Sequence, residues 1–252
     1  MVDHKNMKLG KLEPKHDRNI PTLSTYTVNL PAPPASVDYS SKVKKWPMMK
    51  NDVLGDCTIA ACGHIIQQWT TYNNKPVVFT DDQIIGLYEK ITGYNPSNPA
   101  TDCGGIETNV LNYWLKNGLY QHTLSGYCSL EPNNHNEIMD AIYWFGNVYI
   151  GVALPLSAQN QTVWSVPSGG PVGAGTPGSW GGHAVPVVGY DSRGLTVVTW
   201  GSLQKMTWQF WNNYCDEAYA LLSPDWTESG KNPQGLDFKQ LEKDMETLKA
   251  VI

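Results

Sequence analysis

The sequence predicts an α+β fold of two lobes, a mainly helical lobe over residues 30–146 and a mainly β lobe over residues 147–222. Signals for helix starts and ends concentrate in the first range, and apolar runs of strand length concentrate in the second. With 252 residues, 41% of them hydrophobic and only 16% charged, the chain is long enough to bury a sizeable core in one compact unit. Its ten tryptophans also favour a tightly folded globule.

Three segments of the first lobe carry helix signals. The run from Cys57 to Trp69 is apolar nearly all round, which is typical of a buried helix. Thr80, followed by Gln83, is a capping signal for a helix that begins just after it. The stretch 107–115 predicts a further helix, which Gly118 ends.

The second lobe contains four predicted strands and one unusual loop. The loop, residues 168–178, is rich in glycine and proline, and it is either a mobile wall of a cleft or an ordinary solvated connector. An aromatic cluster beyond the third strand is predicted to belong to the core: Trp208, Trp211 and Tyr214. The strands are Val148–Leu154, Ala184–Tyr190, Leu195–Trp200 and Ala218–Leu222.

The two ends of the chain lie outside these lobes. Residues 1–29 are polar and predict an extended arm, of the kind that usually serves as a tether. Residues 223–252 form a C-terminal extension that contains an amphipathic helix over 238–249. That helix is expected either to pack back on the body of the protein or to bind a partner.

Charge and hydropathy exclude several classes of partner. The net charge of −5 argues against nucleic acid or an anionic membrane as the main partner. No apolar run approaches the roughly 20 residues that span a bilayer, and the first residues contain no apolar signal core. We therefore expect a cytoplasmic protein, or one that lysis releases or that is packaged in a phage particle. The sequence leaves its oligomeric state open.

Cys57 is the first candidate for chemistry. An ordinary thiol has a pKa of about 8.5, and only its thiolate attacks, so a nucleophilic cysteine needs a lowered pKa. The start of a helix and a nearby imidazolium both lower it, and Asp56 is placed to cap the helix with its carboxylate. The alternative is that Cys57 is only a small buried hydrophobic residue.

The other cysteines do not indicate a metal site. The chain has five, at positions 57, 62, 103, 128 and 215, so at least one is unpaired in a monomer. A Cys103–Cys128 bridge is possible, but free thiols are favoured without a secretory context. No two are spaced as Cys-x-x-Cys, so a structural zinc site is not expected, and we expect no cofactor.

Several short motifs follow one another in order over residues 30–222. Gly181-Gly182-His183 enters a predicted strand 126 residues after the segment Gly55-Asp56-Cys57. The other segments are Leu30-Pro31 with Val37-Asp38, Asn51, Asp102-Cys103-Gly104-Gly105, the helix-then-strand pattern over 138–152, Thr199-Trp200-Gly201 and Asp216–Ala220. These motifs resemble the papain-like cysteine peptidases, in which the cysteine also comes early and the histidine late, and most closely their uncharacterised bacterial and phage-encoded members.

The resemblance implies a papain-like fold, with Cys57 on the helical lobe, His183 on a twisted antiparallel β lobe and a cleft between them. It implies that Cys57 attacks an amide carbonyl of a peptide or protein, that His183 is the general acid and base, and that Asn51 binds the oxyanion. Four residues are expected to bind substrate: Gly104, Gly105, Gly182 and Trp200. Residues 1–29 are too short for the family's long helical propeptide, so inhibition by a propeptide is not expected.

Three positions depart from the family pattern. Val198 stands where the family has the asparagine that orients the histidine, and Thr199 could replace it only if the strand register differs. Asn51 is shorter than the family's glutamine, and Thr58 replaces an aromatic residue. These departures keep a second hypothesis open, an inactive papain-like module with a binding or particle-structural role.

Two further residues are considered and set aside. His64 lies seven residues after Cys57, and we expect it to be a hydrogen-bonded core histidine rather than a second base. Asp191 lies eight residues after His183 and is expected at the far end of the strand, too distant to orient the imidazole.

Overall fold

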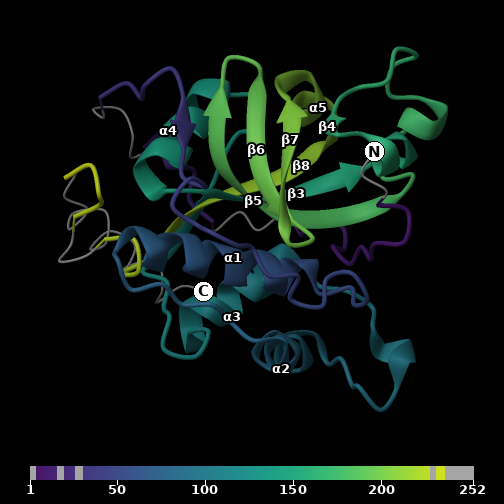
Figure 1. Ribbon diagram of the computed structural model, residues 1–252, viewed down its shortest axis with the longest axis horizontal. Helices are drawn as coiled ribbons and strands as arrows, with labels where there is room; N and C mark the ends of the chain where they lie inside the picture. Colours follow the sequence, from purple (N-terminus) through teal and green to yellow (C-terminus); the bar gives the residue numbers. More distant parts are fainter. Residues whose placement is uncertain (1–3, 16–19, 26–30, 228–230, 236–252) are drawn as a thin grey trace.

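The computed structural model describes residues 4–15, 20–25, 31–227 and 231–235. It has the predicted α+β fold, with helices α1, α2 and α3 beneath a single large sheet and α4 and α5 level with the upper part of that sheet (Figure 1). The α-helices are α1 (Cys57–Tyr72), α2 (Asp81–Thr92), α3 (Glu107–Asn117), α4 (His135–Phe145) and α5 (Trp208–Tyr214). The strands are β1 (Val37–Asp38), β2 (Gly126–Ser129), β3 (Val148–Leu154), β4 (Val163–Trp164), β5 (Gly181–Asp191), β6 (Gly194–Thr199), β7 (Ser202–Thr207) and β8 (Cys215–Leu222).

The sheet runs in the order β2-β8-β3-β5-β6-β7-β4, and β1 adds to β5. Every pairing is antiparallel except that of β4 with β7. β2 comes from the range assigned to the helical lobe, yet it pairs with β8 at the edge of the sheet. The chain therefore crosses between helices and sheet more than once.

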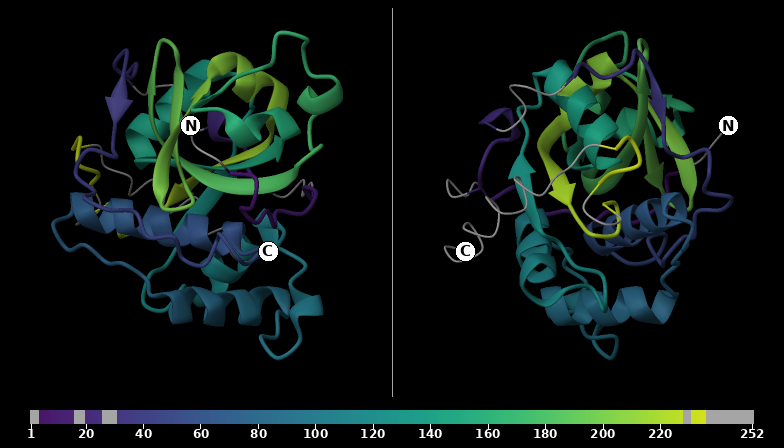
Figure 2. Two further views of the ribbon diagram at one scale, coloured as in Figure 1. Left: turned by 45° about the vertical axis from the view of Figure 1, so that its right-hand side comes forward. Right: turned by 90° about the vertical axis from the view of Figure 1, so that its left-hand side faces the viewer.

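Helix α1 is the central helix of the molecule. It lies along the sheet, between the sheet and α2 (Figures 1 and 2). Every residue of the helix from Cys57 to Thr70 is buried, as its apolar composition predicts. The phenol of Tyr149, on β3, donates a hydrogen bond of 3.0 Å to the carbonyl of Thr58 and fixes the first turn against the sheet.

The predicted helix ends are confirmed at α2 and α3. Thr80 and Gln83 form a capping box, because the side chain of each accepts from the backbone amide of the other. Gly118 follows α3 with a positive φ of 73°, which glycine adopts without steric cost. Two elements that the sequence did not predict, β7 and α5, follow the third predicted strand.

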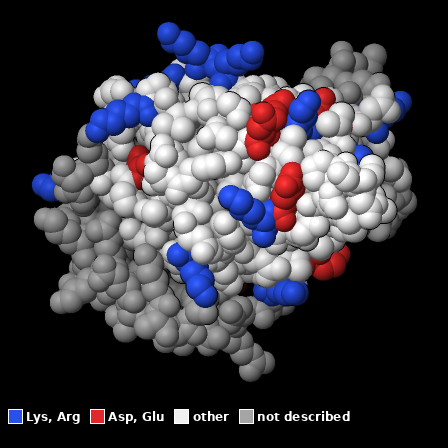
Figure 3. All heavy atoms as spheres, turned by 90° about the horizontal axis from the view of Figure 1, so that it is seen from below, with Lys and Arg blue, Asp and Glu red and all other residues white. Residues whose placement is uncertain are grey.

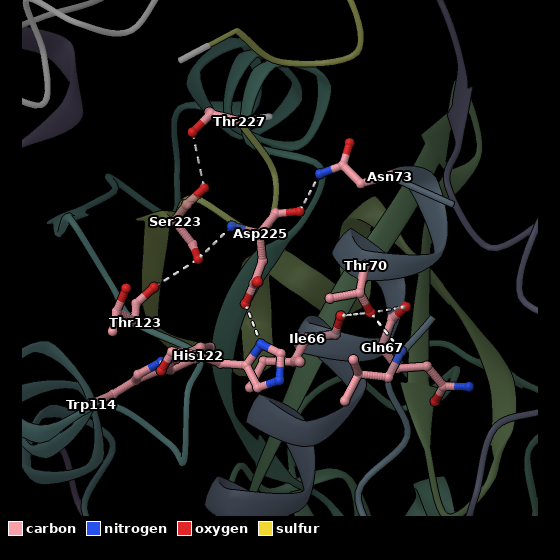
Figure 4. Close-up of polar contacts among 11 residues, drawn as sticks. Ile66, Gln67, Thr70, Asn73, Trp114, His122, Thr123, Ser223, Asp225 and Thr227 are labelled. Atoms are coloured by element: carbon pink, nitrogen blue, oxygen red, sulfur yellow. Dashed lines mark hydrogen bonds and ion pairs between the residues drawn. The ribbon is translucent and has the colours of Figure 1, made fainter. Parts of the chain in front are cut away.

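A polar network ties the chain after β8 to the helical layer (Figure 4). The imidazole Nδ1 of His122 lies 2.8 Å from the carboxylate of Asp225, whose backbone carbonyl accepts from Asn73 at the end of α1. Ser223 donates to the carbonyl of Thr123 at 2.7 Å.

The predicted C-terminal helix over 238–249 lies outside the described residues.

Surface charge, the state of the cysteines and the length of the helices were each considered in the sequence analysis and can be compared with the structure. On the face shown in Figure 3, acidic and basic side chains are interspersed rather than gathered by sign. All five cysteines are free thiols, so the possible Cys103–Cys128 bridge is not formed, and Cys128 is buried while Cys103 is exposed. Among the helices described, none combines the length and the apolar composition needed to cross a bilayer.

Candidate active site

Cys57 is the first residue of α1, and its side chain is completely buried. The backbone amides of Ala184, on β5, and of Gly10, on the N-terminal arm, lie close enough to its Sγ to favour the thiolate form. Asp56 precedes the helix, but its side chain makes no capping bond, so the predicted cap is wrong. The thiol therefore sits between the helix start, the strand that carries His183 and a segment from the start of the chain.

His183 lies on β5 and is also fully buried. Its Nε2 lies 2.7 Å from the hydroxyl oxygen of Thr199, and Nδ1 has no hydrogen-bond partner within the described part of the chain. The imidazole stacks on the ring of Trp200 with centroids 4.5 Å apart and planes 16° from parallel. The ring is thus fixed from one face and at one nitrogen, which leaves Nδ1 as the nitrogen that can exchange a proton.

The period of the strands explains why Thr199, and not Val198, meets the histidine. Val187 on β5 pairs with Val197 on β6. Because alternate residues of a strand share a face, His183 and Thr199 lie on the face of this pair, and Val198 points to the other face. There Val198 packs with Trp46 and Val188 in a small separate apolar cluster.

Replacing Thr199 by valine is expected to destabilise the protein by about 1–3 kcal/mol, because Nε2 of a buried imidazole would lose its partner. Thr199→Ser keeps the hydroxyl and is the matched control, with a smaller cost from one lost methyl group. Urea unfolding of the three proteins measures the difference. Equal loss in both variants would mean that packing, and not the hydrogen bond, holds Thr199 in place.

Asn51 and Asp56 form a buried pair beside the thiol. The amide Nδ2 of Asn51 donates a bond of 3.1 Å to Oδ1 of Asp56, and both residues are buried. Oδ2 of Asp56 has no partner among the described residues. Desolvation raises the pKa of Asp56 to about 8. The hydrogen bond from Asn51 lowers this pKa, but by less than desolvation raises it. One hydrogen of the Asn51 amide is therefore used by Asp56.

The raised pKa of Asp56 predicts a pH dependence of stability. Between about pH 4 and pH 8 the folded protein keeps a proton on Asp56 that the unfolded chain has lost, so this carboxyl makes the fold less stable as pH rises through that window. Asp56→Asn removes the titration and is expected to gain at least about 1.4 kcal/mol over the wild type between pH 4 and pH 8. Urea unfolding of both proteins across this range measures the gain, and parallel curves would contradict it.

The N-terminal arm, residues 4–15, lies where α1 and β5 meet (Figures 1 and 2). The amide of Lys11 donates to the carbonyl of Gly182 at 3.0 Å, and the amide of Leu12 donates to Gly105 at 2.9 Å. The amide of Gly105 donates in turn to the carbonyl of Gly10 at 2.8 Å. The backbone groups predicted to bind substrate thus hold the chain's own arm, and the prediction of a tether is wrong for these residues.

Glycine is required where the arm crosses the thiol. A Cβ at position 10 would lie 1.9 Å from the carbonyl oxygen of Gly55, and one at Gly104 would lie 2.0 Å from the carbonyl oxygen of Gly10. The arm then continues to Trp200, whose ring nitrogen donates to the carbonyl of Lys8 at 3.3 Å and whose ring lies 4.7 Å from that of His4. All four predicted substrate-binding residues therefore lie along the arm.

Burial under the arm suppresses the charge of both catalytic candidates. Desolvation raises the pKa of Cys57 to about 12 and lowers the pKa of His183 to about 3, with His4 adding to the second effect. The predicted lowering of the thiol pKa by the helix start and an imidazolium is therefore wrong for this state. The pair is a neutral thiol and a neutral imidazole, because burial removes the water that would stabilise the ions.

The residues set aside behave as expected. The ring nitrogen Nε2 of His64 lies 2.9 Å from the carbonyl of Pro47, inside the core. Asp191 ends β5 and binds the guanidinium of Arg193 at 2.8 Å. Within the described part of the chain, no group of three or more His, Cys, Asp or Glu side chains is placed to hold a metal ion.

Solved structures share this architecture at low sequence identity. Xylellain, a cysteine protease from Xylella fastidiosa, superposes with a TM-score of 0.67 at 15% identity over 86% of this chain and 97% of its own. Digestive procathepsin L 3 of the Tenebrio molitor larval midgut gives 0.59 at 17% identity, over 86% of this chain and 76% of that one. Procathepsin B S9 from Trypanosoma congolense gives 0.58 at 13% identity, over 85% and 86%.

No protein-family model and no curated protein matches the sequence. The likeness is therefore one of architecture, which extends over most of the chain and is shared with a cysteine protease and two procathepsins. The chain has the papain-like fold.

Proposed function

We propose that this protein is a cysteine peptidase held in a latent state by its own N-terminal arm. The observation that carries the proposal is the convergence on one thiol: Cys57 starts a buried helix, its Sγ lies near the amide next to His183, and His183 is hydrogen-bonded to Thr199. A nucleophile, a base and a third group that orients the base are what acyl transfer requires. The likeness of fold to cysteine proteases supports the same reading.

The proposed reaction begins when the arm leaves and water enters the cleft. His183 takes the thiol proton at Nδ1, and the thiolate attacks the carbonyl carbon of an amide. The backbone amide of Cys57 and the second amide hydrogen of Asn51 donate to the oxyanion. The imidazolium then protonates the leaving amine as the C–N bond breaks, and water, deprotonated by His183, hydrolyses the thioester.

The orientation of the arm explains why it is not itself cleaved in this state. Gly10 presents its amide N–H to Sγ, while its carbonyl oxygen accepts from Gly105 on the other side. The thiol therefore faces a hydrogen-bond donor rather than an electrophilic carbon. The arm occupies the cleft and offers no bond for attack.

The test uses the full-length chain and its Gly10→Ala variant, whose added Cβ cannot sit 1.9 Å from the carbonyl oxygen of Gly55. Both proteins are incubated with a mixture of peptides, and new N-termini are identified by mass spectrometry. We expect cleavage by the variant and little by the wild type. A folded Gly10→Ala protein that cleaves no peptide would overturn the proposal.

One observation favours a second candidate, a non-catalytic binding module on the same scaffold. The cleft is filled by the protein's own residues, and both Cys57 and His183 are neutral there. Such a module would release its arm to a partner without any acyl transfer. A Gly10→Ala protein that binds peptides unchanged, with no acyl-enzyme in its intact mass, would support this reading.

A further inference from the structure

The side chain of Lys11 enters a pocket beside the cleft. Only 1% of it is exposed, although lysine is rarely buried so completely. Its Nζ lies 2.8 Å from Oδ2 of Asp216 and 3.1 Å from Oε1 of Glu217. The contact with Asp216 is a hydrogen bond and the contact with Glu217 is an ion pair, so the pocket holds the ammonium group against two opposite charges.

The pocket is built by three elements that meet there. Asp216 and Glu217 lie on β8, Glu107 is the first residue of α3, and Gly151 lies on β3. A Cβ on Gly151 would lie 2.0 Å from Cε of Lys11. The pocket is therefore deep enough for a long side chain only because residue 151 is a glycine.

The pocket contains a third acidic residue besides the two that contact the ammonium group of Lys11. Glu107 is completely buried, and neither of its carboxylate oxygens has a hydrogen-bond partner among the described residues. Burial alone would lower the pKa of Lys11, but Glu107, Glu217 and Asp216 together raise it above its usual value. Burial raises the pKa of Glu107 well above its usual value, and a cation that bonds to this carboxyl would favour its charged form. The pocket therefore fits a cation that bonds to several groups.

The path of the arm shows which substrate residue would reach this pocket. Gly10 lies at the thiol, the residues before it run toward Trp200 beside His183, and Lys11 fills the pocket on the other side. His183 must protonate the leaving amine, so the leaving group lies on its side of the thiol. The pocket is therefore on the acyl side, one residue beyond the residue whose carbonyl is attacked.

We propose that the pocket of Glu107, Asp216 and Glu217 selects substrates with lysine or arginine as the second residue before the scissile bond, and that Lys11 occupies it as an internal mimic. This inference rests on the proposed peptidase function, which it extends to a substrate class. Arginine fits the excess of acceptors, because its guanidinium has five N–H donors in place of the three of an ammonium group.

The experiment compares thiol-directed peptidyl ketone probes on full-length Gly10→Ala protein. The probes differ only in the second residue before the reactive group, which is lysine, arginine, leucine or glutamate. Labelling of Cys57 is followed by intact mass. We expect the basic probes to label at least about tenfold faster than the leucine probe, as charge-assisted bonds to buried carboxylates require.

Glu217→Gln in the same background tests the charge without changing the shape, since its side-chain oxygen can still accept from Tyr219, which donates to Oε2 of Glu217 at 2.8 Å. We expect this variant to reduce the lysine-to-leucine ratio several-fold. Glu131→Gln, at an exposed glutamate, is the matched control and should leave the ratio unchanged. A ratio near one in the parent protein, or an equal effect of both substitutions, would overturn the pocket proposal.

The experiments distinguish a wrong pocket proposal from a wrong peptidase proposal. Labelling by a ketone probe needs only a reactive Cys57 and an accessible pocket, whereas peptide hydrolysis needs the complete reaction. Hydrolysis without preference for a basic residue would refute the pocket proposal and still support the peptidase proposal. Faster labelling by basic probes without any hydrolysis would support the pocket and refute the peptidase.

Discussion

Gly10→Ala is expected to raise the rate at which iodoacetamide alkylates Cys57 by a factor on the order of 10³ at pH 8. With a pKa of about 12, roughly one thiol in 10⁴ is ionised at this pH, whereas a thiol with an ordinary pKa of about 8.5 is ionised in about a quarter of the molecules. The added methyl group displaces the arm, water returns to Sγ, and the pKa falls. Peptide mapping by mass spectrometry after timed alkylation measures the rate at each cysteine.

Two references make this measurement specific. Cys103 is exposed in the wild type, so its alkylation rate should be the same in both proteins. Gly169→Ala is the matched control variant, because a Cβ there meets nothing within 4 Å. If Cys57 in the Gly10→Ala variant reacts no faster than in the Gly169→Ala variant, the arm does not control the thiol.

Cys57→Ala, introduced into the Gly10→Ala background, is expected to reduce peptide hydrolysis to the uncatalysed level. The substitution removes the only atom that forms the proposed acyl-enzyme, and loss of a nucleophile is not replaced by the other groups of a catalytic unit. Folding should survive, because one sulfur atom is lost from the end of a helix that is otherwise packed along its length. Initial rates on a peptide cleaved by the parent, together with circular dichroism, measure both effects.

Cys62→Ala is the control for this second prediction. Cys62 lies on the same helix and is equally buried, and its thiol donates to the carbonyl of Thr58 at 3.2 Å. Cys62→Ala also removes one buried sulfur atom from α1, but it leaves Cys57 and His183 unchanged. If the two substitutions lower hydrolysis equally, a disturbance of α1 and not the loss of a nucleophile explains the result.

The fold could be predicted from the sequence largely because its signals are local. The capping box at Thr80, the glycine after α3 and the apolar run of α1 each specify an element within a few residues. β7 was missed because its polar residues, among them the adjacent Gln204 and Lys205, leave no apolar run of strand length. Helix α5 was missed because its aromatic residues were assigned to the core without a secondary structure.

The sequence provided candidate residues for the site but no information on whether they are accessible. Motif order identified Cys57, His183 and the glycines of the cleft, and the two-residue period of β6 decides between Val198 and Thr199 once one pair of the ladder is known. No local pattern marks Gly10 and Lys11, because their partners are residues 105 and 182. The burial that neutralises Cys57 and His183 arises from packing between segments far apart in the chain, so the sequence could not reveal it.

The arm and the cleft it fills belong to the same covalent chain, and this has a kinetic consequence. Diluting the protein leaves the fraction of closed molecules unchanged, because a tethered segment keeps an effective concentration near the millimolar range whatever the concentration of the protein. A peptide added from outside competes with that local concentration, and its apparent affinity falls in proportion to the fraction of molecules that are open. Abundant substrate, or a cut that separates the arm from the body, would therefore be the effective signals for this protein, and its own concentration would not.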